Sequence, residues 1–182
     1  MLTASQILKE REAGRLGIHP FNIDQLNPNS YNVKLANKLK VYNEIVLDSR
    51  KDLKFETIEI PEEGLILLPG KLYIGATQEI ISSDHFISSI DGRSSVGRLG
   101  LSIHATAGFG DVGFKGTYTL EIFVIEPVKI YPDMLIAQVH FTAPEGDVDF
   151  LYRGRYQGQL DPTTSKFNLT EDQLGKDYHY KS

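Results

Sequence analysis

The amino-acid sequence predicts an all-β protein, a sandwich or barrel preceded by one short helix. After Pro20, short segments rich in Val, Ile, Leu, Tyr and Thr follow one another, with almost no helical periodicity between them. Turn-forming sequences such as PNS, PEEG, PG and YPD separate these segments. Short apolar segments divided by frequent turns are typical of strands that pack as two sheets or close into a barrel.

The N-terminal helix is predicted to begin at Thr3. Thr3 and Gln6 have the spacing of a capping box, and Ile7 and Leu8 give the helix an apolar edge. Gly14 is a suitable end, because glycine readily adopts the left-handed conformation that follows many helices.

The predicted strands follow in close succession, at residues 31–36, 38–43, 44–48, 55–60, 64–68, 72–77, 85–90, 100–107, 117–126, 135–141 and 148–152. We expect residues 1–152 to form a single β domain that includes the helix. Residues 153–182 are polar and rich in Gly, Gln, Thr and Lys, so we expect a C-terminal lid or tail outside the core.

Composition narrows the classes of function. The 182 residues suffice for one domain with a real core, and a hydrophobic fraction of 41% is ordinary for a globular protein. The net charge of −5 argues against broad binding to nucleic acid. The sequence has no cysteine, which excludes disulfides, thiolate nucleophiles and cysteine-bound zinc. Without an apolar run of membrane-spanning length or a signal-peptide pattern, we expect a cytoplasmic protein with no membrane partner.

The segment DGRSSVGRLGLSIHATAGFGDVGFKGTYTLEI, residues 91–122, gathers charged, hydroxyl and imidazole side chains among glycines. GRSSVGR approaches a P-loop, but Arg98 and Leu99 replace the required Lys and Ser or Thr, and RLGLSIH alternates like a strand instead of opening a helix. GFGDVG fits GxGxxG, but the strand-like FKGTYTLEIFVIE follows it, so we interpret the match as a glycine-rich turn. A serine with His104 and Asp111 could form a hydrolase triad, although the nucleophile-elbow pattern GxSxG is absent.

Strand alternation assigns the polar residues of this segment to faces. The predicted strand from Leu99 buries Leu99, Leu101 and Ile103 on one face. The other face then carries the polar side chains of Arg98, Ser102 and His104.

Glu121 lies in the next predicted strand, opposite an apolar face made of Leu120, Ile122 and Val124. With Thr119 and Phe123 as neighbours on its own face, its carboxylate is expected to be partly desolvated, which suits a group that shuttles protons. The alternative is a solvated strand residue or the partner of a buried arginine.

Three further groups of residues have both a functional and a plain structural interpretation. Asp111 lies in a glycine-flanked turn that would let backbone approach a ligand, or it merely stabilises that turn. Arg93, Ser94 and Ser95 offer the donors that a phosphate needs, or they form an exposed loop. YRGRYQGQ, from Tyr152, has the composition of a flap over a ligand and equally of a disordered end.

These residues together resemble a known family. The segment 91–122 closely resembles the central motif of dCTP deaminases, which are relatives of the trimeric dUTPases. ILKEREAGRLGIHPFNIDQLNPNSYNVKLANKLKVY is similar to the N-terminal region of that family, YPDMLIAQVHF to its late core strand, and RYQGQ to its nucleotide-covering C-terminal segment. The resemblance covers most of residues 1–167.

The resemblance implies a distorted β-barrel or jelly roll of the dUTPase-like (β-clip) type, assembled as a homotrimer with active sites at subunit interfaces. It implies a hydrolase that binds dCTP- or dUTP-type nucleotides. Mg²⁺ is expected to enter with the triphosphate rather than in a site made by protein ligands alone. Deamination would proceed without zinc, because the cysteine ligands of the zinc-dependent deaminases are missing.

The resemblance also implies roles for individual residues. Glu121 matches the general acid and base that activates water, and Ser94 and Arg98 match residues that hold this water and glutamate. The loop of His104, Ala105, Thr106 and Ala107 matches the segment that contacts the pyrimidine through its backbone. The triphosphate-binding positions correspond to Arg93, Ser94 and Ser95, with Arg155, Tyr156 and Gln159 from the closing tail.

Within the family, the resemblance favours the branch that converts dCTP to dUMP and pyrophosphate, which supplies dUMP for dTMP synthesis. Members that only deaminate commonly have an arginine where this chain has Phe109. Asp111 would position a second water against the α-phosphate, as its counterpart in dUTPases does. Two features depart from the common pattern: Asn32 stands where many relatives have aspartate, and GQLDPTTSK differs from GQxGPTxS.

Three alternatives remain open at the level of sequence. The first is a deaminase that releases dUTP. The second is a dUTP diphosphatase without deamination, against which the combination of Glu121, Ser94 and Arg98 argues. The third is a non-catalytic module that senses nucleotides on the same barrel.

Overall fold

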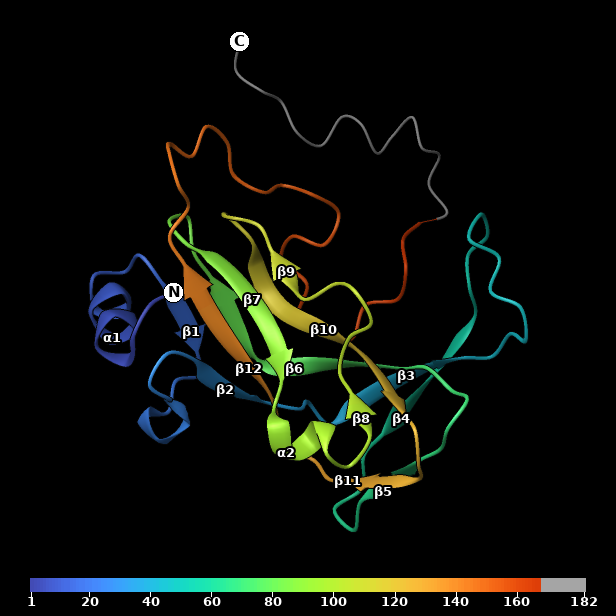
Figure 1. The fold of residues 1–182 in the computed structure, drawn as a ribbon. Helices are drawn as coiled ribbons and strands as arrows, with labels where there is room; N and C mark the ends of the chain where they lie inside the picture. Colours follow the sequence, from blue (N-terminus) through green and yellow to red (C-terminus); the bar gives the residue numbers. More distant parts are fainter. Residues whose placement is uncertain (168–182) are drawn as a thin grey trace.

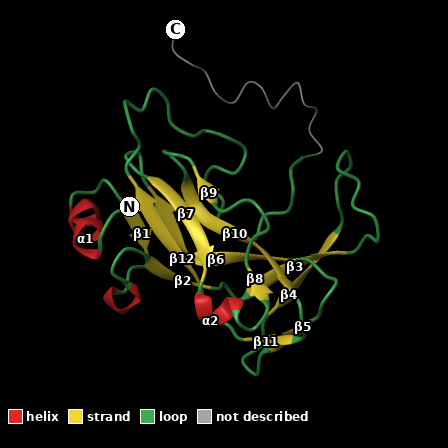
Figure 2. Cartoon of the chain, in the orientation of Figure 1, coloured by secondary structure: helices red, strands yellow, loops and turns green. Residues whose placement is uncertain are grey.

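The computed structural model of the chain describes residues 1–167, and within this range the strands form three sheets in which every pair is antiparallel (Figure 2). The largest has six strands, in the order β4-β3-β6-β10-β8, with β1 also paired to β6. These strands are β1 (Gly17–His19), β3 (Lys38–Tyr42), β4 (Phe55–Glu59), β6 (Tyr73–Ser82), β8 (Leu101–Ser102) and β10 (Lys115–Val124).

The four-stranded sheet has the order β2-β12-β7-β9, so β9 lies at its edge. Its strands are β2 (Tyr31–Lys34), β7 (Ile87–Gly92), β9 (Phe109–Gly110) and β12 (Leu135–Thr142). A small third sheet pairs β5 (Leu65–Leu67) with β11 (Val128–Ile130). The two α-helices of the described chain are α1 (Ala4–Glu12) and α2 (Ser94–Gly97), and a 3₁₀ turn, η1, spans Ile23–Gln25.

The core lies between the two larger sheets, and buried residues of both belong to one continuous hydrophobic cluster. On β10, Leu120 and Ile122 are fully buried, and Val124 is nearly so, which confirms the predicted apolar face. On β12, Val139 and Phe141 are fully buried. Because side chains alternate along a strand, the opposite face of β10 is left for Thr119 and Glu121.

The helix α1 begins after Thr3, but it does not form the predicted capping box. The Thr3 side chain makes no hydrogen bond to the helix backbone, and Gln6 Nε2 donates instead to Glu10 Oε1 at 2.6 Å. Gly14 follows the helix with φ of +71°, so it provides the left-handed turn expected at its end. No helix within residues 1–167 has the length and apolar character needed to cross a membrane.

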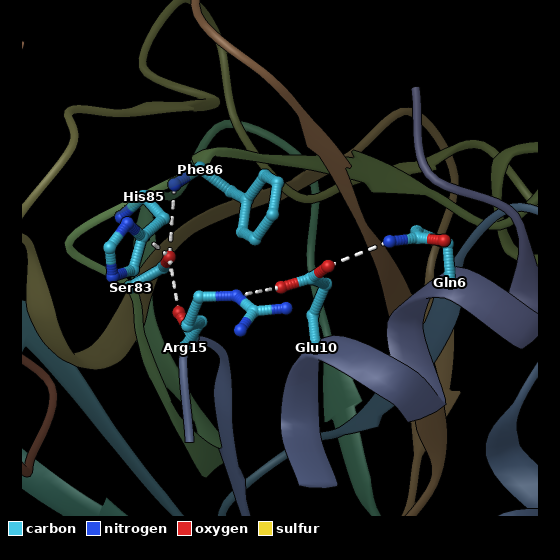
Figure 3. Close-up of polar contacts among 6 residues, drawn as sticks. All are labelled: Gln6, Glu10, Arg15, Ser83, His85 and Phe86. Carbon is cyan, nitrogen blue, oxygen red and sulfur yellow. Dashed lines mark hydrogen bonds and ion pairs between the residues drawn. The ribbon is translucent and has the colours of Figure 1, made fainter. Parts of the chain in front are cut away.

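A chain of polar contacts joins α1 to the turn between β6 and β7 (Figure 3). Glu10 accepts a hydrogen bond from Arg15 Nε, and the Arg15 carbonyl accepts one from Ser83 Oγ at 2.8 Å. Ser83 Oγ in turn accepts from the backbone amides of His85 and Phe86. The N-terminal helix is thereby tied to the turn that leads into β7.

Two of the predicted strands are wrong. Residues 44–48 belong to the loop between β3 and β4, which extends from the body in Figure 1, and Ile45 there is fully exposed. Residues 148–152 form no ladder; Tyr152 N donates to the Val112 carbonyl at 2.8 Å in a single backbone contact. Both segments have residues that favour strands, but β propensity produces a strand only where a neighbouring strand offers partners.

The predicted strand at residues 100–107 is reduced to β8. Gly100 has φ of +78° in a turn just before it, so Leu99 is exposed and does not share the buried face of Leu101 and Ile103. The segment GRSSVGR itself contains the single turn of α2, which the sequence did not predict. The strands β1, β9 and β11 were not predicted, because segments of two or three residues are too short for alternation to show.

Candidate active site

A pocket of about 540 Å³, called here the main pocket, opens beside the polar face of β10. The strand contributes Tyr118, Thr119 and Glu121 to its wall. The remaining lining residues come from the segment that precedes β10, from β3 and the start of β6, and from the C-terminal tail: Ala105, Ala107, Phe109, Gly110, Asp111, Phe114, Tyr42, Leu72, Ile74, Tyr152, Tyr156, Gln159, Thr163 and Ser165.

Glu121 is half-buried on this wall, and the segment after β8 contacts both its backbone and its side chain. The Glu121 amide donates to the Ile103 carbonyl at 2.8 Å. Its carboxylate Oε2 accepts a hydrogen bond from the Ala105 amide at 3.2 Å. The loop after β8 is therefore held against Glu121, and the pyrimidine-contacting segment predicted from the sequence lies next to the predicted proton carrier.

The four residues of that loop do not all reach the pocket. Ala105 and Ala107 line it, whereas His104 and Thr106 are not among its wall residues. The His104 ring is directed toward Asp91, with Nε2 3.8 Å from Asp91 Oδ1, and His140 Nε2 lies 3.1 Å from the other oxygen of the same carboxylate. His104 therefore takes part in a cluster beside the main pocket.

Asp111 lies exposed on the pocket wall in the turn between β9 and β10. Its carbonyl accepts a hydrogen bond from the Phe114 amide at 3.1 Å, and Gly113, with φ of +93°, donates its amide to the Ser83 carbonyl at 2.7 Å. Gly113 needs the left-handed conformation here, which any other residue adopts with strain. The glycine-rich turn predicted from GFGDVG is confirmed, and a strand follows it.

The tail after Tyr152 folds over the pocket side of β10, as far as residue 167. Gln159 Nε2 donates to the Thr117 carbonyl at 2.8 Å, and the Thr117 amide donates back to the Gln159 carbonyl at 2.9 Å. Ser165 N donates to Tyr42 Oη at 3.0 Å, which joins the tail to β3. Tyr156 and Gln159 line the pocket, whereas Arg155 bonds to the Lys166 carbonyl and is not part of the wall. Residues 168–182 of the predicted tail lie outside the described residues.

The residues predicted to bind phosphate and hold the glutamate lie elsewhere on the same chain. Arg93 Nη1 donates to the Leu135 carbonyl at 3.0 Å, and Ser94 and Ser95, which follow it in α2, are exposed. None of Arg93, Ser94, Ser95 and Arg98 lines the main pocket. α2 follows the last residue of β7, whereas β9, which leads to Asp111, pairs with the first half of that strand. The structure therefore gathers Glu121, Asp111, Ala105, Ala107, Tyr156 and Gln159 but separates them from the α2 residues.

Comparison with known proteins identifies the family. A family model described as dCTP deaminase-like matches residues 1–143, most of the chain. The chain belongs to the dCTP deaminase-like family.

Curated relatives in this family match nearly the whole described chain. A protein named "dCTP deaminase, dUMP-forming" from Hathewaya histolytica is 49% identical over 157 residues, which cover 86% of this chain and 91% of the relative. One of the same name from Clostridium acetobutylicum is 48% identical over 157 residues, with 86% and 91% covered. The family predicted from the sequence is confirmed.

A solved structure supports the fold. The crystal structure of a 2′-deoxycytidine 5′-triphosphate deaminase from Agrobacterium tumefaciens superposes with a TM-score of 0.62 at 19% sequence identity. The match covers 79% of this chain and 48% of that one, so this chain corresponds to about half of the longer protein. The predicted all-β fold of the dCTP deaminases is thereby confirmed.

The sequence did not predict several residues that line the main pocket. Tyr118 and Thr119 are neighbours on β10, so simple alternation places them on opposite faces, yet both line the pocket. The reason is a register shift in the pairing of β10 with β6 between Thr117 and Thr119, which turns the strand locally. Tyr42, Leu72 and Ile74 reach the pocket from strands far away in sequence, and no local motif marks them.

Proposed function

We propose that this chain hydrolyses dCTP to dUMP, by deamination of the cytosine ring followed by release of pyrophosphate. The observation that carries this proposal is that two carboxylates, Glu121 and Asp111, line one pocket together with Ala105 and Ala107. The two relatives described above share the name "dCTP deaminase, dUMP-forming", which favours the same overall reaction.

In the proposed deamination step, Glu121 transfers the proton. A water molecule attacks C4 of the cytosine, and the Glu121 carboxylate accepts one of its protons. The protonated Glu121 then returns the proton to the amino group, which leaves as ammonia, so that one water is consumed and uracil is formed. The Ala105 amide that donates to Glu121 Oε2 at 3.2 Å fixes the carboxylate for this transfer.

The tail and the loop after β8 provide the substrate contacts in this proposal. The backbone groups of Ala105 and Ala107 face the ring that is to be recognised. Gln159 Oε1 is buried and has no hydrogen-bond partner within residues 1–167, so it is available to a donor on a ligand. Buried polar atoms are normally hydrogen-bonded, and a nucleotide is the partner that we propose.

In the proposed phosphate-cleaving step, Asp111 holds a second water molecule. Its exposed carboxylate orients the water for attack on the α-phosphorus, and the bond to the departing pyrophosphate breaks, which leaves dUMP. Mg²⁺ enters with the triphosphate in this proposal, since this ion commonly binds substrate phosphates together with only one or two carboxylates. Asp111 is a hard oxygen ligand of the kind the ion prefers, and it lines the same pocket.

The α2 residues complete the site from a neighbouring copy of the chain in this proposal. Arg93, Ser94, Ser95 and Arg98 are the cationic and hydroxyl donors expected to hold the triphosphate, yet they lie outside their own chain's pocket. Beside α2, the side chains of Leu99 and Ile125 are exposed, and the Ile125 amide bonds the Gly100 carbonyl at 2.9 Å. An apolar surface next to unused phosphate-binding groups favours a homotrimer whose active sites lie between subunits. The cytoplasmic location remains a prediction from the sequence.

A product assay tests the proposal. The protein is incubated with dCTP and MgCl₂, and ammonia, dUTP, dUMP and pyrophosphate are followed over time. We expect ammonia and dUMP in equal amounts with little free dUTP. Accumulation of dUTP would select the branch that only deaminates, and dUMP formation from dUTP without ammonia release from dCTP would select a dUTP diphosphatase.

The Glu121→Gln variant tests whether Glu121 transfers the proton during deamination. It keeps the size of the side chain but removes the proton acceptor, so ammonia release should fall by about 10²-fold or more, the contribution typical of general acid–base catalysis. Glu62→Gln, in an exposed turn away from the pocket, is the matched control and should retain full activity. Ammonia release by Glu121→Gln at the wild-type rate would mean that another group carries the proton.

A further inference from the structure

Tyr118 joins β10, the strand that carries Glu121, to β7, the strand that pairs with β9 just before Asp111. It lies on β10, only 5% exposed, and its ring contributes to the wall of the main pocket. Its hydroxyl Oη lies 2.6 Å from Ser88 Oγ and donates to the Ser88 carbonyl at 3.2 Å. The strand that carries Glu121 is thereby bonded through a side chain to β7.

Ser88 connects this contact to the segment just before Asp111. In the ladder between β7 and β9, Ser88 is the partner of Gly110, and Asp111 is the next residue. β9 is only two residues long and lies at the edge of its sheet, so the ladder gives it support from one side only. The segment before Asp111 therefore depends on contacts outside the sheet.

The Tyr118 hydroxyl supplies such a contact. A Cβ atom built on Gly110 would lie 2.1 Å from Tyr118 Oη and 2.8 Å from Ser88 Oγ. The phenol therefore lies directly against the Gly110 backbone, and only glycine leaves room for it. The ladder with Ser88 holds the Gly110 backbone in the sheet, and the Tyr118 hydroxyl lies against the position that a Cβ atom of this residue would occupy.

The ionisation of Tyr118 suits this role. Burial raises the pKa of its hydroxyl to about 12, the negative charge of Asp111 acts in the same direction, and the hydrogen bond with Ser88 opposes them. The phenol is therefore protonated throughout the neutral range, so its hydroxyl can donate to the Ser88 carbonyl over that range. Because the Tyr118 hydroxyl is neutral, it adds no second negative charge beside the Asp111 carboxylate, which faces the phosphates in the proposed function.

We propose that Tyr118 is a positioning residue for the phosphate-cleaving step, which acts by fixing Gly110 and so directing the Asp111 carboxylate into the pocket. This inference rests on the proposed function and adds to it a residue outside the predicted site. Glu121 is positioned independently, by its bonds to Ile103 and Ala105. Loss of the Tyr118 hydroxyl should therefore affect the second step and spare the first.

The experiment compares Tyr118→Phe with the wild type, with dCTP and separately with dUTP as substrate in the presence of MgCl₂. Phe keeps the ring and removes only the hydroxyl. We expect ammonia release from dCTP within about twofold of wild type, and a rise of at least about tenfold in the ratio of dUTP to dUMP released, since small misplacements of reacting groups cost up to about 10²-fold in rate. Cleavage of added dUTP should slow by the same factor.

Two further variants keep the test decisive. Ser88→Ala removes Ser88 Oγ but keeps the carbonyl acceptor, so it should shift the product ratio in the same direction by a smaller factor. Tyr31→Phe also removes a fully buried phenol hydroxyl, which accepts from Asn22 N at 2.9 Å away from the pocket, and it should leave the ratio unchanged. Thermal unfolding of each variant establishes that it is folded.

Asp111→Asn, measured in parallel, separates failure of this inference from failure of the proposed function. If Asp111→Asn raises the dUTP to dUMP ratio and Tyr118→Phe does not, the positioning role is wrong and the proposed function stands. If Asp111→Asn leaves the ratio unchanged, the division of labour between the two carboxylates is wrong. Equal losses of ammonia and dUMP in Tyr118→Phe would show a general structural role and overturn the inference.

Discussion

Glu121→Gln and Arg98→Ala variants should each lose activity as pure proteins, yet regain it when the two chains share one oligomer. Glu121 lines the main pocket of its own chain, whereas Arg98 is exposed on the surface outside that pocket. If the active site joins the pocket of one subunit to α2 of the next, a complete site needs an intact Glu121 from one chain and an intact Arg98 from its neighbour.

The expected recovery follows from the cyclic arrangement of a trimer. A trimer with two chains of one variant and one chain of the other contains three interfaces, and in either composition only one of them combines an intact pocket with an intact α2. Mixed trimers should therefore show about one third of wild-type ammonia release. Each pure variant should retain about a hundredth or less, the loss typical for removal of one preorganised catalytic group.

The assay uses two affinity tags. The variants are co-expressed with different tags, and oligomers that carry both are isolated by two successive affinity steps and tested with dCTP and MgCl₂. Glu121→Gln chains with both tags serve as the baseline, because no interface in them has an intact glutamate. Doubly tagged mixed oligomers no more active than this baseline would refute the intersubunit site, and so would full activity of Arg98→Ala alone.

Two further predictions concern the tail and the N-terminal helix. Tyr42→Phe removes the hydroxyl that accepts from Ser165 N, so the KM for dCTP should rise about threefold with kcat little changed, and steady-state kinetics with an unchanged KM would contradict a role in closure of the tail. The hydrogen bond from Arg15 holds the pKa of Glu10 below its ordinary value of 4.5, an effect that burial partly opposes. A depressed carboxyl pKa stabilises the folded state above the unfolded pKa, and this contribution is lost as the pH falls below 4.5 through the folded pKa. Glu10→Gln should therefore be less stable than wild type at pH 7 and lose less stability on acidification below pH 4.5, as measured by denaturant unfolding across that range; parallel pH curves for the two proteins would contradict it.

The sequence predicted well those features that local periodicity determines. The burial of Leu120 and Ile122 follows from alternation in a long strand, and the position of Glu121 on the opposite face follows with it. The turn at Asp111 follows from its flanking glycines, which allow backbone conformations that other residues avoid. These features depend on a few consecutive residues, so they are visible without knowledge of the fold.

The errors arose where a structure depends on distant partners. Residues 44–48 have the composition of a strand, yet they extend beyond the pairing of β3 with β4. Leu99 fits the apolar face of a continuous strand, but Gly100 interrupts that strand with a left-handed turn. Tyr118 and Tyr42 became recognisable as pocket residues only once a strand irregularity and a long-range approach placed them there. Local patterns contain no information about either effect.

The two halves of the central motif, α2 and the segment with Asp111 and Glu121, lie apart in the fold, which bears on how the active site is completed. Residues 91–122 are continuous in sequence and form one motif, yet in space α2, at the end of β7, lies apart from the turn that holds Asp111 and the strand that holds Glu121. A short helix with exposed arginine and hydroxyl groups costs little to maintain at a surface, whereas a carboxylate that moves protons benefits from a part-buried wall. In a symmetric ring every chain presents α2 to one neighbour and a pocket to the other, so a motif divided in this way still completes every site. Catalysis would then require assembly, and dissociated chains would retain the pocket without the groups proposed to hold the triphosphate.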